Sequence, residues 1–114
     1  MPLIRPFVPS KDMDVSVAFY SALGFTLSHR DDSLAIMDTQ GAGILIQNYW
    51  VEEWAGNWMA QLFVEDLDAW WPRTAGLAER FGVRAPQAPE MRPWGIRVGF
   101  VFDPFGPLWH VAQP

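Results

Sequence analysis

The sequence has no cysteine, and only 18% of its 114 residues are charged. Without cysteine there is no disulfide, no thiolate metal ligand and no cysteine nucleophile, so any site must be built from other side chains. Eight Lys and Arg residues stand against 13 Asp and Glu residues. Because no basic cluster supplies the charge that drives binding to phosphates, we expect no nucleic-acid partner.

Long apolar runs are also missing from the sequence. No stretch approaches the roughly 20 residues that cross a bilayer, so we expect no membrane segment and no membrane partner. The start, Met1 to Arg5, lacks the apolar core of a signal peptide, which favours a cytoplasmic protein. A chain of 114 residues has room for one globular domain, and we predict a single domain over residues 1–114.

Seven tryptophans are the unusual feature of the composition. Large rings fill the core of a small protein, and we predict that role for Trp70 and Trp109. Three further tryptophans lie near two adjacent glutamates, and two roles stay open for them. In the first role they bind a cationic ligand between an aromatic ring and a carboxylate, and in the second they pack the junction in the middle of the chain or a dimer interface. The three are Trp50, Trp54 and Trp58.

The order of sequence signals repeats once along the chain. Residues 13–23 and 67–81 each have apolar side chains at helical spacing, which predicts two helices. The candidate N-terminal cap is Ser10 or Asp12 for the first helix and Asp66 or Asp68 for the second, and a glycine follows each helix. Pro72 lies inside the second helix and lacks a backbone N–H, so we expect an irregular first turn there.

Strand-like runs surround both predicted helices in the same order. We expect strands at residues 3–9, 25–30, 34–38 and 43–49 in the first half, and at 59–64, 83–85, 96–102 and 108–112 in the second. Residues 51–57 and the proline-rich residues 86–93 are expected to be loops. The sequence therefore predicts an α+β fold of two βαβββ modules, module 1 at about 1–50 and module 2 at about 59–114, joined by a linker at about 51–58.

A tandem βαβββ repeat with these local motifs resembles the vicinal oxygen chelate superfamily, which includes glyoxalases, bleomycin resistance proteins and extradiol dioxygenases. The resemblance covers nearly the whole chain and rests on segments 6–12, 19–25, 64–67 and 103–106. The motif Pro93-Trp94-Gly95-x-Arg97 is similar specifically to the bleomycin-resistance-like members. This resemblance implies that the modules form a curved mixed sheet with an open cup.

Members of that superfamily hold a metal ion on the first and last strands of each module. The resemblance places these four positions at Arg5, Leu45, Met59 and His110. Only His110 is a usual metal ligand, so we expect no metal, no cofactor and no catalytic residue. For His110, contact with a ligand and a structural hydrogen bond remain equally open. His29 matches no ligand position, and we expect it to be solvated.

The resemblance and the missing metal ligands together imply a binding function. We expect a metal-independent protein that sequesters a bulky aromatic or cationic small molecule, such as a bleomycin-like antibiotic, and that forms a homodimer. The alternative is a superfamily enzyme of the lyase, isomerase or dioxygenase type with an atypical or absent metal site. The candidate ligand-binding residues are Arg5, Phe7, Leu45, Gln47, Trp54, Met59, Gln61, Trp94, Arg97 and His110.

Overall fold

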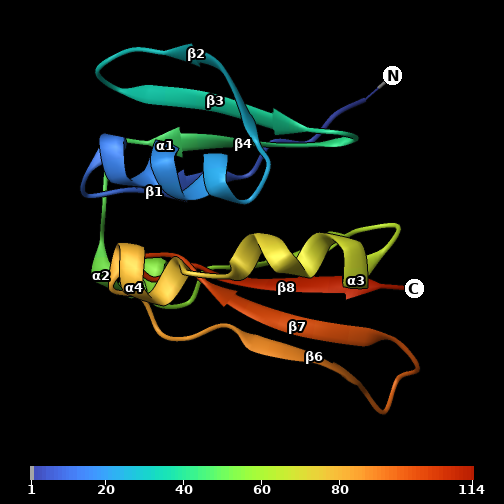
Figure 1. Cartoon of the computed structure of the whole chain (residues 1–114). Helices are drawn as coiled ribbons and strands as arrows, with labels where there is room; N and C mark the ends of the chain where they lie inside the picture. Colours follow the sequence, from blue (N-terminus) through green and yellow to red (C-terminus); the bar gives the residue numbers. More distant parts are fainter. Residues whose placement is uncertain (1) are drawn as a thin grey trace.

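The structure is a computed structural model that describes residues 2–114 and contains two successive modules (Figure 1). Module 1 consists of β1 (Phe7–Pro9), α1 (Met13–Ala22), β2 (Thr26–Arg30), β3 (Leu34–Thr39) and β4 (Ala42–Gln47). A short helix, α2 (Glu52–Ala55), lies in the connection. Module 2 consists of β5 (Met59–Phe63), α3 (Leu67–Trp70), a 3₁₀ turn (Trp71–Thr74), α4 (Leu77–Phe81), β6 (Gln87–Met91), β7 (Arg97–Phe102) and β8 (Leu108–Gln113).

Each module forms its own four-stranded mixed sheet. The strand orders are β1-β4-β3-β2 and β5-β8-β7-β6, so the two sheets have the same topology. In each sheet the first strand pairs in parallel with the last, and the remaining neighbours are antiparallel. Phe7 lies opposite Leu45 in module 1 and Gln61 lies opposite His110 in module 2. The predicted α+β class and repeated βαβββ order are therefore confirmed.

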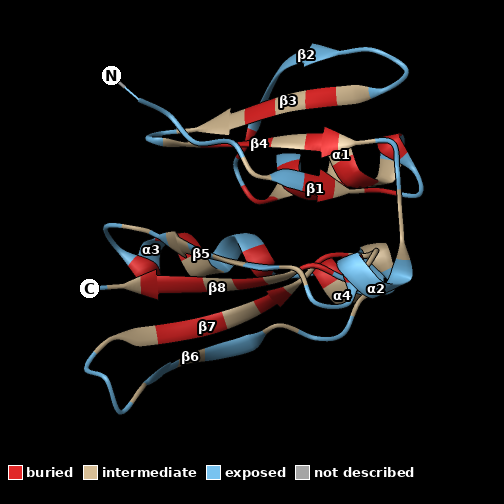
Figure 2. Cartoon of the chain, turned by 180° about the vertical axis from the view of Figure 1, so that it is seen from behind, coloured by how far each residue is buried: buried red, intermediate tan, exposed pale blue. Residues whose placement is uncertain are grey.

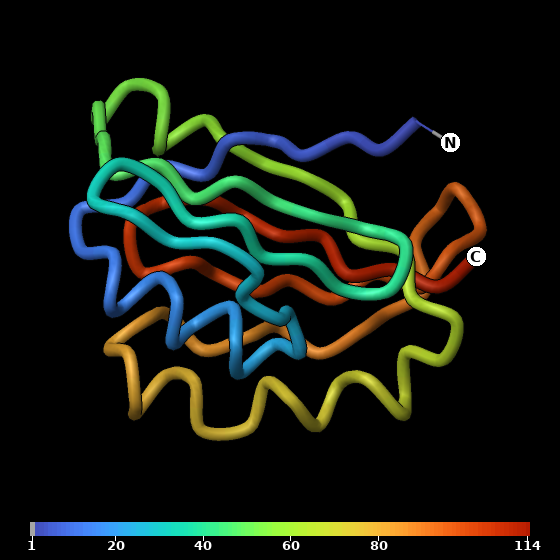
Figure 3. Tube along the Cα trace, turned by 90° about the horizontal axis from the view of Figure 1, so that it is seen from above, coloured from blue at the N-terminus to red at the C-terminus, as the bar shows by residue number. Residues whose placement is uncertain are grey.

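The helices lie between the two sheets. In Figure 1 the sheet of module 1 is at the top and that of module 2 at the bottom, and α1, α3 and α4 lie between them. Viewed from above, the helical segments of both modules run along the same side of the strands (Figure 3). Buried residues from both modules form one hydrophobic cluster (Figure 2). Trp70 and Trp109 are 8% and 5% exposed within it, which confirms their predicted core role.

Local capping explains where the helices begin. The Asp12 carboxylate accepts a hydrogen bond from the Val15 amide at 3.3 Å, and the Asp66 carboxylate accepts one from the Ala69 amide at 3.1 Å. Such bonds satisfy amides that have no partner in the first turn of a helix. The break near Pro72 is larger than expected, because the predicted second helix is divided into α3, the 3₁₀ turn and α4.

Several predicted boundaries were wrong. Residues 83–85 do not form a strand, and the proline-rich segment expected to be a loop contains β6. As an edge strand, β6 tolerates Pro89 because one side of an edge strand makes no sheet hydrogen bonds. Residues 3–6 precede β1 rather than belonging to it, and the predicted loop at 51–57 contains α2. Within residues 2–114, none of the helices has the length and apolar character needed to span a membrane.

Candidate functional site

Each sheet has one face against the helices and one that points away from them, which we call the outward face. In module 1 a row across the outward face runs from Phe7 through Leu45 to Ile36, because these residues are partners in the strand register. Gln47 follows on the same side of β4 as Leu45. Phe7 is 57% exposed, so an apolar ring on this face is open to a ligand or to another protein surface.

Arg5 lies at the edge of the same outward face and is paired with an acid. Its guanidinium donates to both carboxylate oxygens of Asp38, at 2.9 and 3.0 Å. The pair crosses Gly43, where an added Cβ would clash with a carboxylate oxygen of Asp38. The hydrogen bond from Arg5 lowers the pKa of Asp38. Arg5 is therefore a partly neutralised cation here, and its charge is not free for a ligand.

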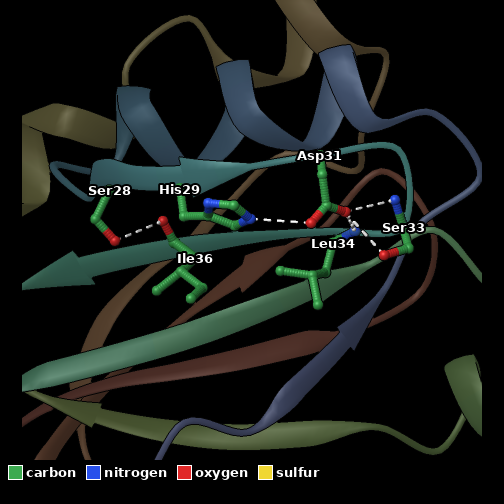
Figure 4. A network of polar contacts seen from close by, with 6 residues as sticks. All are labelled: Ser28, His29, Asp31, Ser33, Leu34 and Ile36. Carbon is green, nitrogen blue, oxygen red and sulfur yellow. Dashed lines mark hydrogen bonds and ion pairs between the residues drawn. The ribbon is translucent and has the colours of Figure 1, made fainter.

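His29 is exposed on β2, as predicted, and belongs to a network at the β2–β3 turn (Figure 4). Its Nε2 lies 2.9 Å from an oxygen of Asp31. The other Asp31 oxygen accepts hydrogen bonds from the Ser33 amide and hydroxyl, both at 2.8 Å, and from the Leu34 amide. These bonds, led by the one to His29, lower the pKa of Asp31. Asp31 lies between His29 and Ser33, so the network holds the turn together.

The outward face of module 2 is largely apolar around two polar side chains. Gln61 on β5 lies opposite His110 on β8, and His110 lies opposite Phe100 on β7. Further apolar side chains share this face by strand alternation. They are Met59, Phe63, Phe102 and Leu108. The sequence-predicted residues Met59, Gln61 and His110 are therefore brought together on one surface.

Arg92, which follows β6, completes this face beside Phe100. The Arg92 guanidinium lies 4.8 Å from the centre of the Phe100 ring, and the His110 ring packs against Phe100 edge to face with centroids 4.8 Å apart. Arg92 Nε and His110 Nε2 are buried and have no hydrogen-bond partner within residues 2–114. Burial, followed by the charge of Arg92, lowers the pKa of His110. The face thus favours the neutral form of His110 and leaves two nitrogens unpaired.

Two other predicted site residues of module 2 lie elsewhere. Arg97 is the register partner of Gln113, and its guanidinium donates to Asp68 of α3 at 2.9 Å. Since Asp68 belongs to a helix, Arg97 extends from the sheet on the helix side, away from His110. Trp94 is 65% exposed at the tip of the β6–β7 connection, where the Gly95 amide donates to the Arg92 carbonyl. Trp94 is therefore available at the surface.

The tryptophans near the linker have separate environments. Lys11 Nζ lies 3.7 Å from the centre of a Trp50 ring, so a cation of the protein itself occupies the place expected for a cationic ligand. Trp58 packs against Trp109 and donates its indole N–H to the Phe7 carbonyl at 2.8 Å. Trp54 is 68% exposed. The packing alternative therefore holds for Trp50 and Trp58, and Trp54 alone of the three presents a largely open ring.

The four positions implied for a metal do not fit a metal ion. Arg5 and Leu45 belong to module 1 while Met59 and His110 belong to module 2, and only His110 offers a suitable donor. Across residues 2–114, no group of three His, Asp or Glu side chains is arranged to hold a metal ion. The candidate residues of the two modules also lie on the outward faces of different sheets.

Sequence reasoning missed a buried polar link between the modules. Tyr20 on α1 donates to the carboxylate of Asp103 in the β7–β8 turn, and the Trp109 indole N–H donates to the Tyr20 hydroxyl at 2.9 Å. Tyr20 is fully buried and Asp103 is 5% exposed. Tyr20 and Asp103 were each part of a recognised motif, yet nothing local indicated their pairing across 83 residues. Arg92 was missed because its segment was expected to be a loop.

The comparisons with known proteins agree with this architecture. The sequence profile of the glyoxalase/bleomycin resistance protein/dioxygenase superfamily matches residues 3–111. The chain belongs to this superfamily. A bleomycin resistance protein of Klebsiella pneumoniae is 28% identical over an alignment that covers 95% of this chain and 89% of that relative. Within the superfamily the chain is therefore similar in sequence to a protein named for bleomycin resistance.

Two solved structures of bleomycin proteins have the same fold as this superfamily member. A bleomycin resistance determinant encoded on transposon Tn5 superposes with a TM-score of 0.81 at 24% identity, covering 99% of this chain and 98% of that one. The bleomycin-binding protein of Streptomyces verticillus, solved with copper(II)-bleomycin, gives a TM-score of 0.80 at 23% identity, covering 100% and 97%. At these identities the likeness shows the fold.

Proposed function

We propose that the protein binds a small molecule and sequesters it without a metal ion, as expected for a bleomycin-resistance-type member of the superfamily. The observation that carries this proposal is the composition of the outward faces. The four positions implied for metal ligands hold Arg5, Leu45, Met59 and His110, while apolar side chains surround them. Such a surface, mostly apolar with a few polar groups, suits an aromatic organic molecule. The sequence similarity to a protein named for bleomycin resistance also supports a small-molecule-binding function.

The proposed ligand site requires a homodimer. Phe7 of module 1 and Met59 and Phe63 of module 2 are 57%, 62% and 54% exposed, and they lie on different sheets. A second copy that sets its module 2 against module 1 of the first would cover both faces and enclose a cup between them. Light scattering is expected to give twice the mass of the chain, and a monomer at every concentration would contradict this arrangement. Location in the cytoplasm stays a prediction from the sequence.

A thermal-shift screen tests the function. We expect bleomycin or an aromatic metabolite to raise the melting temperature, because a ligand that binds only the folded state stabilises it. The shift should be the same with and without a chelator. Recovery of a chemically altered ligand would instead favour the enzyme alternative.

A further inference from the structure

A cavity of about 410 Å³, which we call the junction cavity, lies between the two modules. Its module 1 wall consists of residues 2–4 and Pro6 before β1 and of residues 41–44 at the start of β4. Its module 2 wall includes residues 60–62 of β5, so the walls belong to the upper and lower sheets of Figure 1. The volume falls within the range of roughly 300–1,000 Å³ that small-molecule sites occupy. A ligand in the junction cavity would contact both modules.

The inner end of the junction cavity is the hydrophobic core. Phe25, Ile44 and Trp109 line the cavity and are buried members of the core cluster. The Trp109 ring packs against Phe25 with centroids 6.3 Å apart, and its indole N–H donates to the Tyr20 hydroxyl. A ligand that enters the cavity therefore reaches a residue of the buried link between the modules, and its binding can be followed at Trp109.

The N-terminal segment forms an outer wall that is anchored to module 1. Arg5 donates to both carboxylate oxygens of Asp38, and the Leu45 amide donates to the Pro6 carbonyl at 3.0 Å. Leu3 and Ile4 line the cavity beside these anchors, yet both are exposed. An anchored wall is in place before a ligand binds, which lowers the entropic cost of binding. A ligand would also cover apolar surface of this segment, which favours binding.

The lining sets the chemical class of the ligand. None of the residues that the structure describes around the cavity carries a charge, and Gln61 supplies the only polar side chain among them. Because β5 is an edge strand, main-chain groups on one side of it make no sheet hydrogen bonds. An ion would lose its hydration in this cavity without gaining a counter-charge. The lining therefore fits a neutral, mainly apolar molecule with one polar group.

We propose that the junction cavity is a second binding site, separate from the cup, for a small neutral molecule of the aromatic alcohol type. The proposal goes beyond the proposed function, because the cup is formed by the outward faces whereas the junction cavity ends in the core between the sheets. The apolar part of the ligand packs against Phe25 and Trp109, and its hydroxyl group bonds to Gln61 or to the edge of β5. Bound between the two walls, the ligand stabilises the packing of the modules.

Three probes that share one ring system test the charge preference of the site. At pH 7, 2-naphthol is neutral, 2-naphthoate is an anion and 2-naphthylmethylammonium is a cation. We expect titration calorimetry of the full chain to show saturable binding of 2-naphthol, at least about tenfold tighter than that of either ion. In an NMR titration with 2-naphthol the indole N–H signal of Trp109 should shift. The signal of Trp94, which is exposed and is not among the lining residues, should not.

Cavity-filling variants test the location of the site. Ala60→Leu fills the cavity from the module 2 wall and Ala42→Leu fills it from the module 1 wall. Each should weaken binding of 2-naphthol at least about tenfold. Ala88→Leu is the matched control, because Ala88 is exposed on the edge strand β6 and does not line the cavity. The probe ranking and the Trp109 shift are measured on the original protein, so they decide the matter even if a filling variant does not fold.

Four results would overturn the second site. They are binding of either ion as tight as that of 2-naphthol, an unshifted Trp109 signal, equal effects of Ala60→Leu and Ala88→Leu, and no saturable binding of 2-naphthol at about 1 mM. The last result is also expected if a segment of a second copy of the chain fills the cavity. The proposed function is tested separately, because binding of a screened ligand that survives Ala60→Leu places that ligand outside the junction cavity.

Discussion

Tyr20→Phe removes a single hydroxyl group from the buried contact between the modules. The hydroxyl donates to Asp103 and accepts from the Trp109 indole, so the variant leaves a buried carboxylate oxygen and a buried N–H without these partners. A hydrogen bond to a charged group contributes about 1.5–3 kcal/mol, and an orphaned donor costs about 1–3 kcal/mol. Allowing for some relaxation, we expect the free energy of unfolding to fall by about 3 kcal/mol. For a chain of this size the melting temperature should drop by about 10 °C.

The loss of unfolding free energy in Tyr20→Phe should depend on pH, because the Asp103 carboxylate changes its protonation state within the pH range of the experiment. Burial raises the pKa of Asp103 from 3.8 to about 6, and the bond from Tyr20 acts to lower it. Because the folded-state pKa lies above the unfolded one, protonation of Asp103 stabilises the fold fully below pH 3.8, and this contribution is lost as pH rises through about 6. The Tyr20 hydroxyl stabilises the ionised form of Asp103. Its removal should therefore lower the free energy of unfolding by about 1 kcal/mol more at pH 8 than at pH 4.5.

Urea unfolding followed by tryptophan fluorescence measures these differences at a fixed protein concentration. Tyr49→Phe is the matched control, because Tyr49 is the other tyrosine and is 51% exposed. We expect the control to unfold like the original protein, in one transition. A Tyr20→Phe variant whose unfolding free energy at pH 8 is within about 0.5 kcal/mol of the original, or whose loss of stability grows as the pH falls, would contradict the predicted role of the Tyr20–Asp103 contact.

Two further predictions concern the ligand and the absence of a metal. Trp94→Ala should leave the melting temperature nearly unchanged, since the ring is exposed, and should weaken ligand affinity roughly tenfold. A fall in the melting temperature of about ten degrees would mean that Trp94 has a structural role. An unchanged ligand affinity would mean that Trp94 is not part of the site. A chelator should leave the melting temperature of the purified protein unchanged, because three of the four implied ligand positions hold Arg5, Leu45 and Met59. One divalent metal per chain by elemental analysis would contradict that expectation.

The helices and most strands could be predicted because their signals are local. Asp12 and Asp66 cap their own helices, and apolar spacing identifies the buried side of each element. The prediction of a loop at residues 86–93 was wrong because residues 87–91 form β6 by pairing with β7. This pairing outweighs the local tendency of a proline-rich segment to be a loop. The alternating pattern of a strand is visible in sequence, whereas its pairing partner is not.

The candidate site was predicted in part for the same reason. Met59 and Gln61 alternate along one strand, so their shared face follows from the sequence. The face on which the Arg97 side chain lies could not be predicted without the register of β7, since a shift of one residue moves a side chain to the opposite face of a sheet. The contact of Lys11 with Trp50 joins residues that are 39 positions apart, and no local sequence pattern predicts it.

Equilibrium titration of the purified protein with bleomycin, in the presence of a chelator, shows whether the protein binds a ligand without a metal ion. We expect saturable binding with one ligand site for each cup of the dimer, and mass spectrometry should recover the ligand chemically unchanged. If bleomycin fails to bind, the same titration with the aromatic ligands from the screen decides the general claim. Binding that requires an added divalent metal, conversion of the bound ligand to a product, or no binding of any tested aromatic molecule would contradict a metal-independent sequestering function.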